Sequence, residues 1–519
     1  MIKTPENPEA TEVAASKKEE TSYRGHRRLR KLITPGKSQS LSQRVVQAGF
    51  WAFVLRIVNR LFGLARTIVL ARVLSPNDFG LFGIALLALS ALETFTQTGF
   101  QAALVQRKGD VCPYLDTAWT VQAIRGVVLA IILFGIAPYV AVFFGEPNAA
   151  PLLRVLGLSM VFQGLTNIGV VFFQKELEFH KQFIYMFSGT LADFGVAIPA
   201  ALILHNAWAL IFGLLAGNLV RMIASYFVHP YRPRFRLERA KARELYTFGK
   251  WILGSSVVVF LATQGDDIFL GKVLGATTLG LYQLAFRFSN LMTTEITHVI
   301  SQVAFPTYSK LQNNVSKLRE GFLMTIEAVA FLSLPLTAGI FILASDFVHL
   351  FLGDQWMPMV SALRILSISG LIRSIAVTGG SLFQAVGRPN MDFWMNLVRV
   401  GVMAVTIYPL TKAFGMNGTA ITVLLGISAT IPVWWGVSSD VIKSNYKEWL
   451  MRLLPSLVGT GIMIMFILLI TRALGQMSFL EFIFSILFAM IIYIAFQIGI
   501  WRLFHFGPIG NLRLFKKSL

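Results

Sequence analysis

The stretch from Arg66 to Gly83 reads RTIVLARVLSPNDFGLFG, and the stretch from Gly265 to Ala285 reads GDDIFLGKVLGATTLGLYQLA. The two align without a gap when one is shifted by 200 residues. The identical pairs include Val73 and Val273, Leu74 and Leu274, Gly80 and Gly280, and Ala85 and Ala285. In each copy a short turn separates two apolar runs. This pattern indicates a duplicated helical hairpin.

The duplication extends well beyond this hairpin. The same shift pairs Trp51 with Trp251, and further along the chain a shift of 210 pairs Arg154 with Arg364. Each copy contains six apolar runs, so both copies enter the membrane in the same direction because six is even. The sequence therefore predicts two parallel repeats related by an axis along the membrane normal.

Composition places most of the chain in lipid. Hydrophobic residues make up 55% of the 519 residues and charged residues 14%, against about 25% charged residues in an ordinary soluble domain. An apolar helix needs about 20 residues to cross a bilayer core. Fourteen runs are long enough: 45–73, 78–105, 115–144, 150–174, 182–204, 207–229, 246–274, 277–307, 320–345, 357–386, 391–411, 417–439, 449–471 and 478–503.

We therefore predict an all-α polytopic membrane protein of about fourteen transmembrane helices. Two six-helix lobes, related as parallel repeats, surround a central cavity, and two C-terminal helices lie outside the repeat. The predicted divisions are a disordered basic tail at 1–42, a first lobe at 43–230, a basic linker at 231–244, a second lobe at 245–445, helices 13 and 14 at 446–505, and a tail at 506–519.

The net charge of +20 comes mainly from residues that flank the apolar runs. Nucleic-acid binding would need these charges gathered on a soluble face, so we expect no nucleic-acid partner. Connections on one side, such as 145–151 and 345–358, contain no Lys or Arg, whereas those on the other side are basic. This asymmetry predicts that both termini are cytoplasmic and that the protein lies in a bacterial inner membrane.

Polar residues follow one stripe of the first predicted helix. The positions on this stripe follow helical spacings of three and four: Arg56, Asn59, Arg60, Gly63, Arg66 and Thr67. An arginine at mid-membrane depth costs about 2.5 to 3.5 kcal/mol. The stripe is therefore expected to face protein or water, and we predict that it lines a substrate cavity.

Other helices carry further candidates. The predicted cavity residues beyond the stripe are Arg125, Arg287 and Asn290, and the predicted proton or sodium carriers are Glu93, Asp266 and Asp267. The repeat register places Arg66 at the position equivalent to Asp266. These charges could instead form buried ion pairs between the lobes, for example between Arg66 and Asp266. For Asp193, Glu327, Arg373 and Arg399 a cavity role and a structural pair both remain open, and Arg221 is expected to be an anchor near a helix end.

The sequence gives little sign of catalysis. Gly36-Lys37-Ser38 lacks the upstream glycine and the preceding strand of a phosphate-binding loop. The single cysteine, Cys112, and the scattered histidines have no metal-ligand spacing. We predict no catalytic residue, metal or cofactor, and a transporter rather than an enzyme.

The stretches 66–83 and 265–285 resemble the polysaccharide transporter family, closest to the colanic-acid exporter type, within the multidrug, oligosaccharidyl-lipid and polysaccharide flippase superfamily. The resemblance implies alternating access and export of a polyprenyl-diphosphate-linked oligosaccharide to the outer leaflet for surface polysaccharide synthesis. A polymerase and a chain-length regulator are the implied partners, besides membrane lipids. The family motif Leu74, Ser75, Pro76, Phe79 and Gly80 is expected to form the turn between the first two helices.

Two alternatives remain open at the level of sequence. A multidrug exporter or other lipid exporter of the same superfamily would share the fold, although cationic drugs would favour an acidic cavity over the arginine stripe. An enzyme or scaffold of polysaccharide assembly is the alternative from another class.

Overall fold

The computed structural model describes residues 41–97, 100, 104, 111–176, 178–388, 390–475 and 477–504. These residues form helices and connections, with no strand among them. The tails predicted at 1–42 and 506–519 lie almost wholly outside this range. The helices of the first half are α2 (Leu41–Val73), α3 (Pro76–Phe95), α5 (Cys112–Phe144), α6 (Ala149–Leu165), η1 (Ile168–Val170), α7 (Val171–Lys175), α8 (Phe179–Leu204) and α9 (Trp208–Val228).

The second half repeats this order with two pairs of helices joined end to end. Its helices are α10 (Arg239–Leu311), α11 (Val315–Ile342), α12 (Ala344–Phe347), the π-helix η2 (Val348–Leu352), η3 (Asp354–Met359), α13 (Val360–Ala385), α14 (Asn390–Ser428), α15 (Ile431–Ile442), α16 (Tyr446–Leu474) and α17 (Phe479–Phe504). Gly275, at φ 80°, breaks α10, and Gly415, at φ 58°, breaks α14. Each break lies where the sequence predicts a turn between two spans.

Within the described residues, nine helices are long and apolar enough to cross a membrane. The nine omit α2 and α10, which carry the charges described below, and α6, which has only 17 residues. The segment Asn390–Ile442 is counted as one span, although Gly415 interrupts the helix within it. An all-helical membrane fold is therefore confirmed, and the count of fourteen spans stays a prediction.

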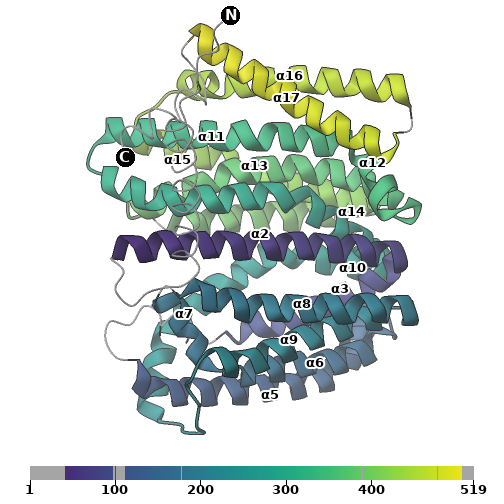
Figure 1. Cartoon of the computed structure of the whole chain (residues 1–519), viewed down its shortest axis with the longest axis vertical. Coiled ribbons are helices and arrows are strands. Elements are labelled where there is room, and N and C mark those ends of the chain that lie inside the picture. The colour runs from purple at the N-terminus through teal and green to yellow at the C-terminus, as the bar shows by residue number, and fades with distance from the viewer. Residues whose placement is uncertain are drawn as a thin grey trace, which may run out of the picture.

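The helices run roughly parallel to one another in a single elongated stack (Figure 1). α16 and α17 form one end of this stack and α5 lies at the other, with α2 between the two halves. Successive spans run in opposite directions, so the turns at Ser75, Gly145, Gly353 and Gly475 fall at one end of the helices and the turns that follow α7, α9 and α15 fall at the other. We call the first set the outer side and the second set the inner side.

Equivalent helices have equivalent neighbours in the two halves. α5 packs on α6 as α11 packs on α13, and α2 packs on α8 as α10 packs on α14. α16 lies against α11, outside this correspondence, and α17 packs on α16. The packing therefore has the rotational kinship that the sequence repeat predicts.

The first turn of the hairpin is fixed by local chemistry. The Ser75 hydroxyl accepts a hydrogen bond from the Asp78 amide at 3.3 Å, and the Asp78 carboxylate accepts one from the Ser75 amide at 3.0 Å. Pro76 occupies the first helical position, where its missing N–H costs nothing. This capping box stops α2 and starts α3 within three residues.

Candidate functional site

The arginine stripe of α2 is turned away from the exposed face of the helix. The exposed apolar side chains of α2 include Phe53, Ile57 and Leu61, which recur every four residues, and Val69, which lies about two turns further on. Arg56, Arg60 and Arg66 are only partly exposed. The apolar face thus suits lipid, and the arginines lie toward the protein interior.

Arg66 pairs with α8. Its guanidinium lies 2.9 Å from an Asp193 carboxylate oxygen, and the two side chains are 13% and 22% exposed. The pair that the sequence offers as an example, Arg66 with Asp266, does not form. The reason is that α2 packs on α8 in its own lobe, whereas Asp266 accepts a hydrogen bond from Tyr282 in the second lobe.

Arg287, in the second half of α10, adds a residue of the second lobe to this group of charges. Its guanidinium donates to the Gly63 carbonyl of α2 at 3.3 Å, and it lies within electrostatic range of Arg66 and Asp193. Arg221 of α9 also acts on Asp193. We call Arg66, Asp193, Arg221 and Arg287 the N-lobe cluster. Three guanidinium groups share one carboxylate there, which leaves an excess of positive charge.

Arg287 is exposed although it lies deep among the helices, because it lines a cavity. The cavity has a volume of about 490 Å³ and lies between α3 and the two halves of α10. Its polar lining residues are Ser90, Gln264, Asp267, Gln283 and Arg287. The cavity is thus a wet space at the junction of the two lobes.

The second lobe contains a different group of charges. The Asp266 carboxylate accepts a hydrogen bond from the Tyr282 hydroxyl at 2.7 Å, and it lies within electrostatic range of Arg373 and Arg399. Asp266 is 2% exposed and Arg399 6% exposed. We call Asp266, Tyr282, Arg373 and Arg399 the C-lobe cluster. The neighbouring Asp267 accepts a hydrogen bond from Gln283 at 3.1 Å, so that two acids stand near two arginines.

The remaining predicted residues are distributed over both lobes. Asn59 accepts a hydrogen bond from Thr190 of α8 at 2.7 Å, beside the Arg66 pair. Asn290 is buried and donates to the Phe286 carbonyl at 3.0 Å. Asn59 thus joins α2 to α8, whereas these bonds of Asn290 lie within its own helix.

Arg125 and Glu93 lie together and apart from the two clusters. The Arg125 guanidinium donates to the Glu93 carbonyl at 2.9 Å and to the Thr96 hydroxyl at 3.1 Å, at the end of α3. Glu93 therefore does not join Asp266 and Asp267 in one site. Glu327, which is 1% exposed, forms an ion pair with Arg452 at 3.1 Å that joins α11 to α16.

The outer end of the lobe junction is closed by residues that are equivalent in the repeat. A Cβ on Gly80 would lie 1.7 Å from the Ala276 carbonyl oxygen, and one on Gly280 would lie 2.0 Å from the Pro76 carbonyl oxygen. The Thr277 hydroxyl lies 3.3 Å from the side-chain oxygen of its repeat mate Asn77. α3 and the second half of α10 thus cross on the pseudo-two-fold axis itself, as a self-complementary contact requires.

A second contact closes the same end. The buried Trp356 donates from its indole nitrogen to the Ala71 carbonyl at 2.8 Å, and Arg72 donates to the Phe351 carbonyl at 2.9 Å. These bonds tie the end of α2 to the η2 and η3 turns of the second lobe. Trp356 could not be singled out from the sequence, because its partner is a backbone group distant in the chain.

An apolar cavity of about 550 Å³ opens on the other side of α2. α2 contributes Leu64 and Ile68, and the rest of the lining comes mainly from α11, α16 and α17. Leu64 and Ile68 flank Arg66 in sequence. The apolar cavity and the N-lobe cluster therefore adjoin the same two turns of α2.

No metal site is found in the part of the chain that the structure describes. No group of three or more His, Cys, Asp or Glu side chains there could hold an ion. The excess positive charge of the N-lobe cluster can hold an anion, and the apolar cavity can hold an apolar chain.

Comparisons with known proteins agree with this architecture. The profile of a family described as "Polysaccharide biosynthesis protein" matches residues 69–361, more than half of the chain. The lipopolysaccharide biosynthesis protein WzxC of Escherichia coli K12 is 27% identical over 81% of this chain and 87% of its own. The succinoglycan biosynthesis transport protein ExoT of Rhizobium meliloti is 26% identical over 64% of this chain and 67% of its own.

A solved structure shares the fold. The lipid II flippase MurJ, in an inward closed conformation, superposes with a TM-score of 0.72 over 87% of this chain and 99% of its own, at 14% sequence identity. At that identity the likeness concerns the fold alone.

Proposed function

The chain belongs to the polysaccharide biosynthesis protein family, and we propose that it is a flippase that carries a polyprenyl-diphosphate-linked oligosaccharide across the bacterial inner membrane for surface polysaccharide synthesis. It is a multi-pass membrane protein that moves its substrate by alternating access. Both termini lie in the cytoplasm, in keeping with the basic inner connections.

The excess of positive charge in the N-lobe cluster carries this proposal. Guanidinium groups bind phosphate oxygens in a forked, charge-assisted geometry. Arg66 and Arg221 share Asp193. Arg287 reaches the cavity, and no carboxylate lies within ion-pair distance of it among the side chains that the structure describes. A diphosphate placed beside Arg287 would complete the charge balance.

The apolar cavity supports a lipid-linked substrate. A polyprenyl chain needs an apolar path beside the site that holds its diphosphate. The cavity between α2 and the α16–α17 pair offers this path, and it adjoins the helix that carries Arg66. The sugar would occupy the wet cavity between α3 and α10.

The closed outer end supports an inward-facing resting state. Gly80 and Gly280 pack backbone against backbone at the outer end of the junction, and the polar cavity lies on the inner side of that contact. Export would then require α3 and α10 to separate at the outer end while the lobes close at the inner end.

Ion coupling is assigned to the C-lobe acids. Asp267 lines the cavity, and one carboxylate oxygen of the buried Asp266 has no hydrogen-bond partner. A proton or sodium ion bound there would neutralise charge that is costly in a membrane. Glu93 is a weaker candidate because it lies beside Arg125 at the end of α3. A polymerase and a chain-length regulator are the proposed partners after export.

Transport in liposomes tests the proposal. We would reconstitute the protein with a fluorescent polyprenyl-diphosphate oligosaccharide and measure its appearance in the opposite leaflet. Arg287→Gln removes a charge-assisted contact of about 2 kcal/mol, so transport should fall about thirtyfold. Arg154→Gln, an exposed arginine of α6, is the matched control and should transport normally.

Two outcomes would contradict the proposal. Wild-type protein that exports cationic dyes but not the labelled lipid would indicate a multidrug exporter. Wild-type protein that leaves the lipid in its original leaflet, yet is needed for polymer formation in an assembly reaction, would indicate an enzyme or scaffold.

A further inference from the structure

The connection between the lobes is an ordered extended segment with an unusual alternation. It runs from His229 to Glu238 with the sequence HPYRPRFRLE, and we call it the strap. Arginines at 232, 234 and 236 alternate with Tyr, Pro, Phe and Leu. An extended backbone places alternate residues on opposite sides, so the two kinds of side chain separate.

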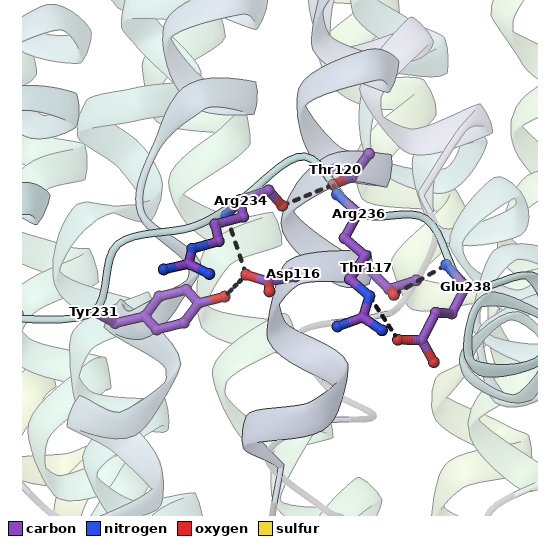
Figure 2. Close-up of polar contacts among 7 residues, drawn as sticks. All are labelled: Asp116, Thr117, Thr120, Tyr231, Arg234, Arg236 and Glu238. Atoms are coloured by element: carbon purple, nitrogen blue, oxygen red, sulfur yellow. Dashed lines mark hydrogen bonds and ion pairs between the residues drawn. The ribbon is translucent and has the colours of Figure 1, made fainter.

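The first turns of α5 hold the strap by its backbone (Figure 2). Alternate amides of the strap find acceptors on α5 side chains, as they would on a neighbouring strand. The bonds run from the Arg234 amide to Asp116 at 3.1 Å, from the Arg236 amide to the Thr120 hydroxyl at 3.0 Å, and from the Glu238 amide to the Thr117 hydroxyl at 3.3 Å. The strap is therefore a built element of the first lobe.

Further contacts fix the beginning of the strap. The Tyr231 hydroxyl donates to Asp116, and the side-chain Nδ2 of Asn167 donates to the Tyr231 carbonyl at 2.6 Å. Burial and the nearby Asp116 carboxylate raise the pKa of Tyr231, which keeps its hydroxyl protonated as a donor. A Cβ on Gly169 would lie 2.3 Å from the His229 ring, so only glycine fits beneath it.

The side chains that this backbone presents are exposed. Arg232, Arg234 and Arg236 are all exposed, and they stand beside Phe235, which is 74% exposed, and Leu237, which is 52% exposed. The Phe235 ring packs edge-on against Trp119 of α5, with ring centroids 4.7 Å apart. The strap thus exposes a row of guanidinium groups along one edge and apolar side chains along the other.

We propose that the strap is a docking surface for anionic phospholipid headgroups of the inner leaflet. It joins the ends of two membrane helices, α9 and α10, so it lies at the depth of the headgroups. Guanidinium groups match phosphate in charge and geometry, and aromatic and apolar side chains beside them suit the headgroup–acyl boundary. The proposal rests on the predicted orientation of the chain and does not depend on the identity of the transported substrate.

Asp116 makes the proposal distinguishable from general attraction to a basic surface. This carboxylate lowers the positive charge around the strap but fixes the backbone that arrays the arginines. Simple electrostatics predicts that Asp116→Asn binds anionic lipid more tightly. A structured site predicts weaker binding, because the arginine row loses its register.

The chain carries a convenient reporter. Its single cysteine, Cys112, is exposed and lies one turn before Asp116 in α5. An environment-sensitive fluorophore on Cys112 would report lipid at the strap in nanodiscs of phosphatidylcholine with increasing phosphatidylglycerol. We expect a saturable, salt-sensitive response in the full chain.

Variants define the expected result. Each arginine near an anionic surface changes affinity about fivefold, so R232Q/R234Q/R236Q should weaken the response roughly a hundredfold. The charge-matched control K310Q/K317Q/K447Q changes exposed lysines on the same side and should respond like the parent. Asp116→Asn and Thr120→Val should each weaken it several-fold.

Three results would overturn the proposal. These are a tighter response in Asp116→Asn, an equal loss in the lysine control, and the same saturation with soluble glycerol phosphate. Thr120→Val changes no charge and removes only the hydroxyl that accepts from the Arg236 amide and donates to the Arg234 carbonyl. It therefore keeps the test decisive if the triple arginine variant does not fold. Loss of the lipid response with unchanged flipping would leave the proposed transport function intact. Loss of flipping with an unchanged lipid response would leave the docking proposal intact.

Discussion

The two lobes carry their charges on corresponding helices but with the signs exchanged. In the first lobe an arginine on α2 pairs with an acid on α8, and in the second an acid on the first half of α10 lies near an arginine on α14. The N-lobe cluster has three arginines around Asp193, is partly open and reaches the cavity through Arg287. The C-lobe cluster is buried, with Asp266 only 2% exposed, and together with the neighbouring Asp267 it has two acids for two arginines.

This difference indicates that the two copies of the duplicated fold have different functions. An excess of positive charge beside water can bind an anionic substrate without a large desolvation cost. A balanced buried group is costly to disturb, and it changes state when a proton or cation enters. Substrate binding and ion coupling would then reside in different copies of the same structural unit.

The largest expected effect comes from giving the first lobe the charges of the second. Arg66→Asp would place two carboxylates together at mid-membrane depth and remove a diphosphate contact, so we expect flipping to be abolished. In the double variant R66D/D193R the ion pair can form again. Protein yield in the membrane should recover, and flipping should not, because the guanidinium then projects from α8.

The double variant separates a structural pair from a binding site. Flipping by the single and the double variant is measured in the liposome assay, and the amount of membrane-inserted protein is measured in parallel. Full recovery of flipping in R66D/D193R would mean that Arg66 and Asp193 serve only to form an ion pair and do not contact the substrate.

The second effect compares the acids of the two clusters. Asp266→Asn leaves Arg399 and Arg373 without their nearest carboxylate in a buried setting, which should destabilise the protein by about 3 to 5 kcal/mol. Asp193→Asn, at a partly open site, should cost about 1 kcal/mol. Thermal unfolding in detergent measures both, with the exposed Asp440→Asn as control. Equal losses would show that the two lobes do not differ in the way proposed.

Much of this arrangement could be predicted from the sequence, for physical reasons. Apolar runs, basic connections and the repeat register depend on local composition, so the helical membrane fold and its duplication could be predicted. The arginine stripe could be predicted because a helix has fixed periodicity. The partner of Arg66 could not, because equivalent residues meet only where helices cross the pseudo-two-fold axis. Asn77 and Thr277 lie on that axis, whereas Arg66 and Asp266 belong to helices away from it.

A smaller effect tests whether the crossing at the axis is symmetric. Gly80→Ala and Gly280→Ala each force a Cβ against a backbone carbonyl of the other lobe. Overpacking of this kind costs typically about 1 to 3 kcal/mol, and here it opposes closure of the outer end. Both variants should raise labelling of a cysteine placed at Asn77 from the outer side, and to a similar extent.

Gly265, in the first half of α10, provides the control. Gly265→Ala meets open space within 4 Å and should leave the labelling unchanged. A large effect of Gly80→Ala with none from Gly280→Ala would mean that the contact is not self-complementary.

The smallest effect concerns the turn that the two copies build differently. Ser75 closes the first hairpin with a capping box, whereas its repeat mate Gly275 closes the second with φ 80°. Ser75→Ala removes one cap and should lower stability by about 1 kcal/mol. Ser75→Gly should cost only a few tenths, because glycine leaves the helix start accessible to water. Gly275→Ser, by contrast, places a side chain in a backbone conformation that it rarely adopts and should cost more than Ser75→Ala. If exchange of the two residues were neutral in thermal unfolding, the turns would be interchangeable, and the divergence of the lobes would be confined to their charges.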